Sequence, residues 1–351
     1  MEEARLPRFL AACRGLDVDA TPVWFMRQAG RSLPEYRAVR ERYGLVEIVG
    51  RAELCAEVSL QPVRRLGVDA AIVFADLSTP LPGLGLSVEV VDGVGPVVSP
   101  LIRSAADLAA FRPFEPRAAV GPLLEAIGLL RRASPVPVIG FAGAPFTVAS
   151  YLVEGGPSRD LARTRAFLIA CPDLFADLLS RLGAMTAAYL RAQVEAGAQA
   201  LQLFDSWAGA LAPVDYALFV RPVMATLLAD LADLEVPIIH FATGTAGYLE
   251  LQAAAGGDVI GLDWRVDLGE ARRRLGRRPV QGNLEPQGVL APWPALAARA
   301  DAVLAAAGDG PGHVFNLGHG VPAAADPEVL RRLVDHVHER TARRPAGSRA
   351  A

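Results

Sequence analysis

The chain has 351 residues, of which 52% are hydrophobic and 21% charged, so it can bury a large core as one big domain or two ordinary ones. Its net charge of −3 argues against a general nucleic-acid binder, and no apolar run is long enough to span a membrane. The first residues, Met-Glu-Glu-Ala-Arg-Leu-Pro-Arg, carry acidic side chains without an apolar signal stretch behind them, which favours a cytoplasmic location.

Cysteine and lysine usage excludes further classes of protein. Cys13, Cys55 and Cys171 are scattered and odd in number, so they indicate neither a disulfide framework nor a metal site. The chain contains no lysine, and all 35 basic residues are arginine. A lysine Schiff base, covalently held pyridoxal phosphate and a P-loop lysine are therefore excluded.

Eight short apolar runs recur along the chain, each preceded by a helical segment and followed by polar or glycine-rich residues. Strands separated by helices pair in parallel, and eight such units in a chain of this length indicate one (β/α)8 barrel. A doubly wound open sheet is the alternative. We expect a single catalytic barrel domain over residues 1–340, with its strands at residues 23–26, 69–74, 137–142, 200–204, 236–241, 259–262, 279–282 and 313–317.

The first of these strands runs directly into a polar turn. Arg27, Gln28 and Arg31 follow it, with Ala29 and Gly30 between them, small enough for the backbone to approach a ligand. Two guanidinium groups at one strand end suit an anionic substrate, because each can hold a carboxylate through two parallel hydrogen bonds. A solvated loop with two arginines is the alternative.

Two segments depart from the alternation of helix and strand. Residues 86–98 alternate and turn at Asp92-Gly93, which predicts a β-hairpin inserted after the second strand. Residues 341–351 are expected to form a disordered tail.

In a barrel of this kind the chemistry sits where strands end and loops begin. No pair of polar residues at these ends resembles a nucleophile with its base. None has metal-ligand spacing, because the strand-end histidines have no cysteine or second histidine nearby. The residues at these ends are Arg27, Gln28, Arg31, Asp76, Tyr151, Asp205, Ser206, Trp207, His240, Thr243, Asp263, Trp264, Asn283, Glu285 and His319.

Several of these strand-end residues lie within five longer sequence blocks. In this order they resemble the signature stretches of the uroporphyrinogen decarboxylase family, over about residues 6–340. The chain departs from the usual pattern of that family at Ser32, Thr243 and Glu285. The blocks are residues 25–31 with 33–37, 141–147 with 149–152, 202–209, 261–264 and 316–320.

The resemblance implies a cofactor-free carboxy-lyase of haem biosynthesis that acts as a homodimeric (β/α)8 barrel. Its reaction removes CO2 from the four acetate side chains of uroporphyrinogen III and gives coproporphyrinogen III. By the same resemblance, arginines of the first turn hold substrate carboxylates and Asp76 receives the pyrrole N–H groups. We expect Asp76, Arg27 and Tyr151 to be catalytic, and these three with Gln28, Ala29, Gly30, Arg31, Ser206 and His319 to bind the substrate, with no metal site.

The expected chemistry needs no external electron acceptor. Expelling CO2 leaves two electrons on the methylene carbon of the acetate, and a pyrrole protonated on a ring carbon can accept them. An ionised Asp76 would accept several N–H hydrogen bonds and stabilise the positive charge on the ring. Arg27 is a candidate for placing the departing acetate and for donating a proton.

Structural alternatives and rival functions stay open. Asp76 can cap a following helix, and Tyr151 and Ser206 can be structural hydrogen-bonding residues. Asp205 and Trp207 are interpreted as residues around the site. One rival is a zinc-dependent corrinoid or folate methyltransferase of the same superfamily, which needs thiolate and imidazole ligands at strand ends. The other is a tetrapyrrole-binding carrier without catalysis.

Overall fold

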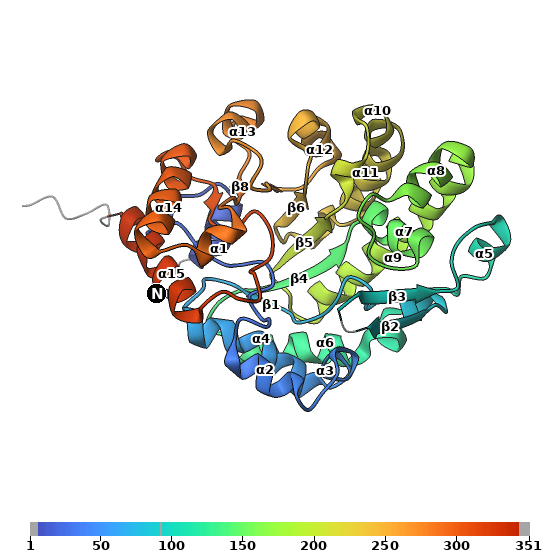
Figure 1. Ribbon diagram of the computed structural model, residues 1–351, viewed down its shortest axis with the longest axis horizontal. Helices are drawn as coiled ribbons and strands as arrows, with labels where there is room; N and C mark the ends of the chain where they lie inside the picture. Colours follow the sequence, from blue (N-terminus) through green and yellow to red (C-terminus); the bar gives the residue numbers. More distant parts are fainter. Residues whose placement is uncertain (1–5, 92, 344–351) are drawn as a thin grey trace, which may run out of the picture.

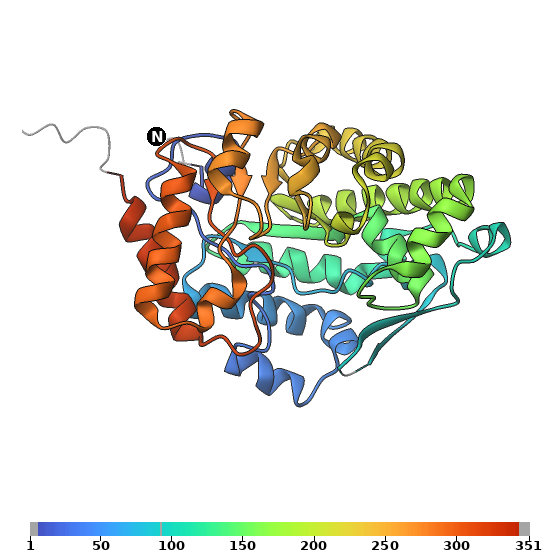
Figure 2. The same ribbon diagram turned by 45° about the horizontal axis from the view of Figure 1, so that its top comes forward.

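The computed structural model describes residues 6–91 and 93–343. A curled, seven-stranded parallel sheet forms its centre, in the order β1-β4-β5-β6-β7-β8-β9, and helices surround it (Figure 1, Figure 2). Strands β4 and β6 are buried along their whole length, as continuous apolar runs in a sheet covered by helices should be. The strands are β1 (Ala71–Ile72), β4 (Val138–Gly143), β5 (Ala200–Asp205), β6 (Ile238–Ala242), β7 (Val259–Gly261), β8 (Val280–Gln281) and β9 (His313–Val314).

Seven of the eight predicted strands contribute to this sheet, and the first one differs. In the segment at 23–26, Val23 forms an isolated parallel bridge with Phe315, directly after β9. The carbonyl of Val23 accepts the N–H of Asp69 at 2.7 Å, so the segment lies between the two edge strands β9 and β1. The N–H of Trp24 donates to the backbone carbonyl of Phe315, but side chains take two of the other donors: Asp69 accepts the N–H of Val23 and Asn316 accepts that of Met26. A full ladder is therefore replaced by a bridge.

Hydrogen-bonded polar side chains cross the interior of the curled sheet. The indole of Trp24 donates to Gln281 at 2.9 Å, and the amide of Gln281 donates to Gln202 at 3.0 Å. Gln202 lies on β5 and Gln281 on β8, with β6 and β7 between them in the sheet. Strands that far apart in a flat sheet are separated by roughly 14 Å, so only curvature brings these side chains into contact.

Helices connect the parallel strands and pack around the sheet. Several begin with proline in the first turn, where a missing N–H costs nothing, and Gly67 ends α4 with φ of +71°. The helices are α1 (Arg8–Cys13), α2 (Pro34–Arg40), α3 (Leu45–Val49), α4 (Ala52–Leu66), α5 (Ala105–Ala109), α6 (Pro116–Ala133), α7 (Pro145–Glu154), α8 (Ala162–Ala170), α9 (Pro172–Glu195), α10 (Pro213–Asp215), α11 (Arg221–Asp230), α12 (Leu249–Ala255), α13 (Leu268–Leu275), α14 (Trp293–Ala307) and α15 (Pro327–Thr341).

Between β1 and β4, strands β2 (Ser87–Val91) and β3 (Gly95–Ser99) pair antiparallel in a separate two-stranded sheet. Of the predicted turn, Gly93 has φ of +78°, while Asp92 lies outside the described residues. The N–H of Val98 in β3 donates to the carbonyl of Gly155 at 2.9 Å. This contact fastens the pair of strands to the end of α7.

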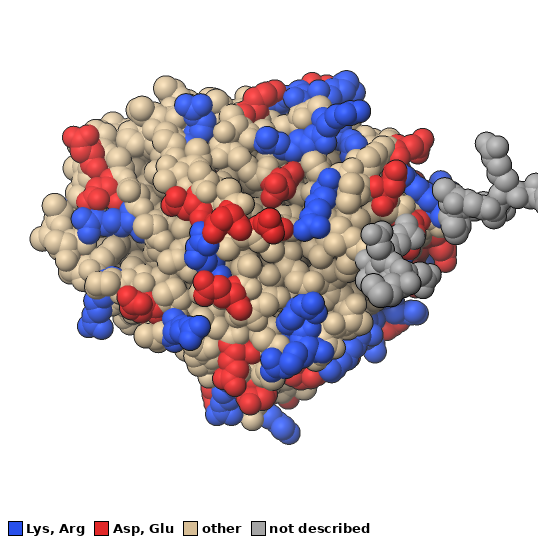
Figure 3. All heavy atoms as spheres, turned by 180° about the vertical axis from the view of Figure 1, so that it is seen from behind, with Lys and Arg blue, Asp and Glu red and all other residues tan. Residues whose placement is uncertain are grey.

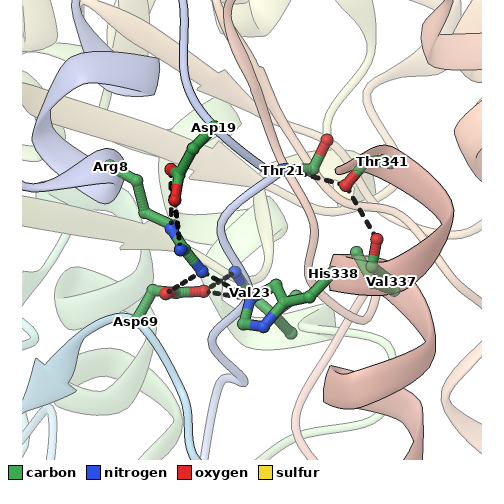
Figure 4. A network of polar contacts seen from close by, with 8 residues as sticks. All are labelled: Arg8, Asp19, Thr21, Val23, Asp69, Val337, His338 and Thr341. Atoms are coloured by element: carbon green, nitrogen blue, oxygen red, sulfur yellow. Dashed lines mark hydrogen bonds and ion pairs between the residues drawn. The ribbon is translucent and has the colours of Figure 1, made fainter. Parts of the chain in front are cut away.

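A charged network joins both ends of the chain to the edge of the sheet (Figure 4). The carboxylate of Asp69 accepts the N–H of Val23 and lies 2.7 Å from Nε2 of His338 on α15. Arg8 on α1 donates to Asp69 at 3.2 Å and forms an ion pair with Asp19. Because Asp69 precedes β1, the network lies at the amino-terminal edge of the sheet, opposite the strand ends that carry the predicted site.

The described chain ends just beyond α15. Thr341 is the last residue of that helix, and Arg343 forms an ion pair with Asp17 at 2.8 Å. Residues 344–351 of the predicted tail lie outside the described residues.

Within residues 6–91 and 93–343, no helix combines the length and apolar character needed to cross a membrane. On the face in Figure 3, acidic and basic side chains are interspersed.

Candidate active site

The predicted site residues come from loops and helix starts that follow different strands. Asp76 follows β1, Tyr151 lies in α7 after β4, and His319 follows β9. Arg27 follows the bridged segment at Val23, and Ser206 comes directly after β5. Since all these strands are parallel, their carboxyl ends meet at one edge of the sheet, where ligands of such folds bind.

Asp76 is held by a local turn and caps no helix. Its Oδ1 accepts the N–H and the hydroxyl of Ser78, and its own N–H donates to the hydroxyl of Thr79 at 3.0 Å. The following short helix begins at Leu81 without a side-chain cap. Among the described residues no group donates to Oδ2 of Asp76. The turn therefore fixes the carboxylate while leaving one oxygen for a ligand.

Tyr151 is a half-buried phenol in electrostatic contact with two other predicted catalytic residues. Burial raises its pKa to about 12; the negative charge of Asp76 raises it as well, and the positive charge of Arg27 lowers it. At neutral pH the hydroxyl therefore keeps its proton and can donate a hydrogen bond. Asp76 and Arg27 therefore both lie within electrostatic range of the Tyr151 hydroxyl.

Arg27 packs directly on the loop that carries His319. Its backbone is left-handed with φ of +60°, which is uncommon for a non-glycine residue. A Cβ on Gly320 would lie 2.4 Å from Cδ of Arg27, and one on Gly318 would lie 2.2 Å from the backbone nitrogen of Trp264. Only glycine fits at position 318, and a side chain at position 320 would displace that of Arg27, so His319 lies on a loop packed between Arg27 and Trp264.

His319 lies in an environment of positive charge. Burial, together with the charges of Arg27 and Arg265, lowers its pKa to about 4, and Asp263 acts in the opposite direction. The ring meets that of Trp264 edge-on, with 6.2 Å between the centroids. His319 is therefore neutral at neutral pH and can donate one hydrogen bond and accept another.

The turn at residues 27–31 separates into a buried support and an exposed rim. Gln28, predicted to contact the substrate, is 0% exposed: its amide donates to the carbonyl of Ala70 and its Oε1 accepts the N–H of Phe25. The hydrogen bonds of this side chain are therefore made within the protein, to the residue before β1 and to the strand segment, and a substrate contact of Gln28 stays a prediction. Ala29 and Gly30 are partly buried, and Arg31 is exposed. Within the described chain, no hydrogen bond or ion pair joins Arg31 to Asp76 or Tyr151.

A buried acid, Asp205, is linked to Tyr151 through Thr147 and Trp207. Asp205, at the end of β5, is completely buried and accepts the hydroxyl of Thr147 at 2.9 Å. Burial raises its pKa to about 7, against the hydrogen bond from Thr147. Thr147 in turn accepts the N–H of Trp207, whose ring lies against Tyr151. Ser206, between the acid and the indole, accepts the hydroxyl of Thr243 on its carbonyl.

A surface hollow lies apart from these residues. A surface hollow of about 600 Å³ lies beside α7 and α8, with Leu101, Arg103, Val153, Arg163, Ala166 and Phe167 as its lining, and contains none of the predicted site residues. Across the part of the chain that the structure describes, no three His, Cys, Asp or Glu side chains form a group that could hold a metal ion.

The fold and the site define an α/β protein in which arginine, aspartate and aromatic side chains meet at the carboxyl edge of a curled parallel sheet. The model of the uroporphyrinogen decarboxylase family (URO-D) matches residues 5–340. The chain therefore belongs to the uroporphyrinogen decarboxylase family, whose members are carboxy-lyases.

Individual relatives agree over nearly the whole length. The uroporphyrinogen decarboxylase of Streptomyces griseus is 53% identical over 337 residues, covering 95% of this chain and 92% of that protein. The one from Salinispora tropica is 51% identical, covering 97% and 92%. Among solved structures, a methyltransferase from Methanosarcina mazei is similar with a TM-score of 0.80 and 21% identity, covering 95% and 97%. At this identity the likeness concerns the fold alone.

Proposed function

We propose that this protein is a decarboxylase of haem biosynthesis that converts uroporphyrinogen III into coproporphyrinogen III by removing CO2 from its four acetate side chains. The observation that carries the proposal is that Asp76, Arg27 and Tyr151 follow different strands, yet Asp76 and Arg27 both lie within electrostatic range of Tyr151. A carboxylate, a guanidinium and a protonated phenol there match a ligand that has N–H groups at its centre and carboxylates at its periphery.

In the proposed reaction the ring of the substrate stores the electrons. A proton adds to a ring carbon of the pyrrole beside the acetate, and the pyrrole becomes cationic. The bond between the methylene and the carboxylate then breaks, CO2 leaves, and the electron pair of that bond neutralises the ring as an exocyclic double bond. A proton adds to the methylene to give a methyl group, and loss of the ring-carbon proton restores the pyrrole. One proton thus replaces each CO2.

Asp76 contributes by stabilising the cationic ring. Its Oδ2 can accept pyrrole N–H groups while the turn to Ser78 holds Oδ1 in place. Charge-assisted hydrogen bonds of this kind contribute about 1.5–3 kcal/mol each, and the interaction strengthens as positive charge develops. Arg27 is proposed to hold the departing acetate, and Tyr151 to donate a hydrogen bond.

The proposal extends to architecture and assembly. The bridge at Val23, between β9 and β1, supports counting that segment as an eighth strand of one closed (β/α)8 barrel, with residues 1–340 as a single catalytic domain and the β2–β3 pair as an insertion. Family membership supports a homodimer that works in the cytoplasm without a cofactor. Sedimentation of the purified protein tests the dimer.

The experiment that tests the activity is anaerobic incubation of uroporphyrinogen III with the purified protein, followed by separation of products by their number of carboxyl groups. We expect material with seven, six and five carboxyl groups and then the four-carboxyl product. A protein that binds the macrocycle and leaves all eight carboxyl groups intact would be a carrier. Stoichiometric zinc in the purified protein, together with methyl transfer to a thiol, would favour the methyltransferase.

A further inference from the structure

Arg265 lies in the loop after β7, immediately beyond Asp263 and Trp264. Its guanidinium stacks on the indole of Trp264, with 3.9 Å between Cζ and the ring centroid. Its Nη1 donates to Oδ2 of the buried Asp263 at 3.0 Å. The stack and the ion pair fix one face and one edge of the guanidinium.

A series of packing contacts connects Arg265 with Arg27. The loop Gly318-His319-Gly320 connects them: Gly320 packs against Arg27, and Gly318 packs against the backbone of Trp264. The guanidinium of Arg265 stacks on the ring of Trp264. Both guanidinium groups act electrostatically on His319. The two arginines therefore belong to one arc of the site, with a neutral imidazole between them.

Arg265 keeps donors for a ligand. Its side chain is 56% exposed, and within the described residues its guanidinium hydrogen bonds are confined to Nη1. Asp263 balances part of its charge, but it also accepts the N–H groups of Gly244 and Arg265. The site thus holds a fixed, partly exposed guanidinium whose remaining N–H groups are available to an anion.

We propose that Arg265 binds a carboxylate of the substrate and, with Arg27 and His319, forms a carboxylate-binding arc on the β7–β9 side of the site. This inference rests on the proposed function and deepens it. Eight carboxylates surround the macrocycle, and two arginines of the first turn are too few to hold them. Arg265 supplies a fixed cation on the side of the site reached from β7.

The test compares Arg265→Gln, Arg265→Lys and wild type in steady-state decarboxylation of uroporphyrinogen III. Glutamine retains a donor toward Asp263 and removes the charge, so the buried carboxylate keeps a partner. Arg273→Gln is the matched control, because Arg273 is an exposed arginine of α13 in an ion pair with Glu270. Thermal unfolding of each variant verifies the fold.

We expect Arg265→Gln to raise KM about tenfold with kcat within twofold, because the loss of one charge-assisted contact weakens binding. Arg265→Lys should recover part of the affinity, and Arg273→Gln should leave KM unchanged. An unchanged KM in Arg265→Gln overturns the inference, as does an equal fall of kcat in the Gln and Lys variants, which would indicate support of Trp264. Absence of CO2 release by wild type contradicts the proposed function instead.

Discussion

The ring of Tyr151 lies on that of Trp207, with 4.5 Å between the centroids and 39° between the planes. The N–H of Trp207 donates to the hydroxyl of Thr147 at 3.3 Å, and this hydroxyl donates to Asp205. Thr147 and Tyr151 are one turn apart on α7, so both ends of the connection are fixed by one helix. A buried acid at the end of β5 is thereby linked to the phenol proposed to contact the substrate.

Thr147→Val should lower kcat by about fivefold while the protein stays folded. Valine preserves the shape but removes the hydroxyl that holds Trp207, and one such hydrogen bond contributes about 1 kcal/mol. Steady-state kinetics measures the effect, with Thr226→Val on α11 as the control, since its hydroxyl donates to a carbonyl of its own helix. If kcat of Thr147→Val equals that of wild type, Trp207 does not position Tyr151.

Asp205→Asn should change how stability depends on pH. The folded pKa of Asp205 is about 7, above its unfolded value near 4, so wild type binds one more proton when folded between these pH values. Its contribution to stability is greatest below the unfolded pKa and falls by up to about 1.4 kcal/mol per pH unit until the folded pKa is passed. Asparagine does not ionise, so the free energy of unfolding of the variant does not fall with pH for this reason.

Urea unfolding of both proteins at pH 5 and pH 7.5 measures the difference. The free energy of unfolding of wild type, relative to the variant, should be lower at pH 7.5 than at pH 5. Parallel curves for the two proteins would show that Asp205 is ionised in the folded state throughout this range.

Asp69→Asn should lower the free energy of unfolding by about 2 kcal/mol without changing kcat or KM. The carboxylate is 11% exposed and is contacted by Arg8, Val23 and His338, and hydrogen bonds to charged groups contribute about 1.5–3 kcal/mol. The matched control is Asp301→Asn, whose partners are also on α15 but whose side chain is 38% exposed. Exposed pairs contribute about 0–1 kcal/mol. Equal losses in the two variants would argue against a role for Asp69 in joining the chain ends.

Arg31→Ala should mainly weaken substrate binding. Arg31 is exposed at the rim of the turn, and its carbonyl accepts a hydrogen bond from Arg37. Its removal should raise KM several-fold and leave kcat nearly unchanged, because an interaction made equally in the ground and transition states affects KM alone. Arg42→Ala, an exposed arginine in the following loop, serves as the control. An unchanged KM would exclude Arg31 as a carboxylate clamp.

The order of strands could be predicted from the sequence because each buried strand is a short, unbroken apolar run bounded by turns. The bridged state of the first strand could not, because it depends on Asp69, which is 46 positions from Val23 and takes its N–H only after folding. The same limit applies to Gln28, whose partner Ala70 is 42 positions away in sequence.

The candidate site could be predicted from the sequence where strand ends coincide with polar residues, and the prediction was incomplete where tertiary contacts decide. Arg265 was missed although it directly follows the strand-end pair Asp263-Trp264. Its significance depends on stacking over Trp264 and on the approach of the loop with His319, and local sequence does not encode either. By contrast, the turn that holds Asp76 uses Ser78, two residues away, so the spacing Asp-x-Ser was a readable signal.

The central claim is that the carboxylate of Asp76 stabilises positive charge on the substrate ring, and turnover of Asp76→Asn tests it most directly. Asparagine keeps the size of the side chain and can still accept from Ser78, so the protein should fold with an unchanged thermal midpoint. We predict that kcat for uroporphyrinogen III falls by roughly 100-fold or more, as for removal of a group that stabilises transition-state charge. A folded Asp76→Asn protein that releases CO2 at nearly the wild-type rate would contradict the account.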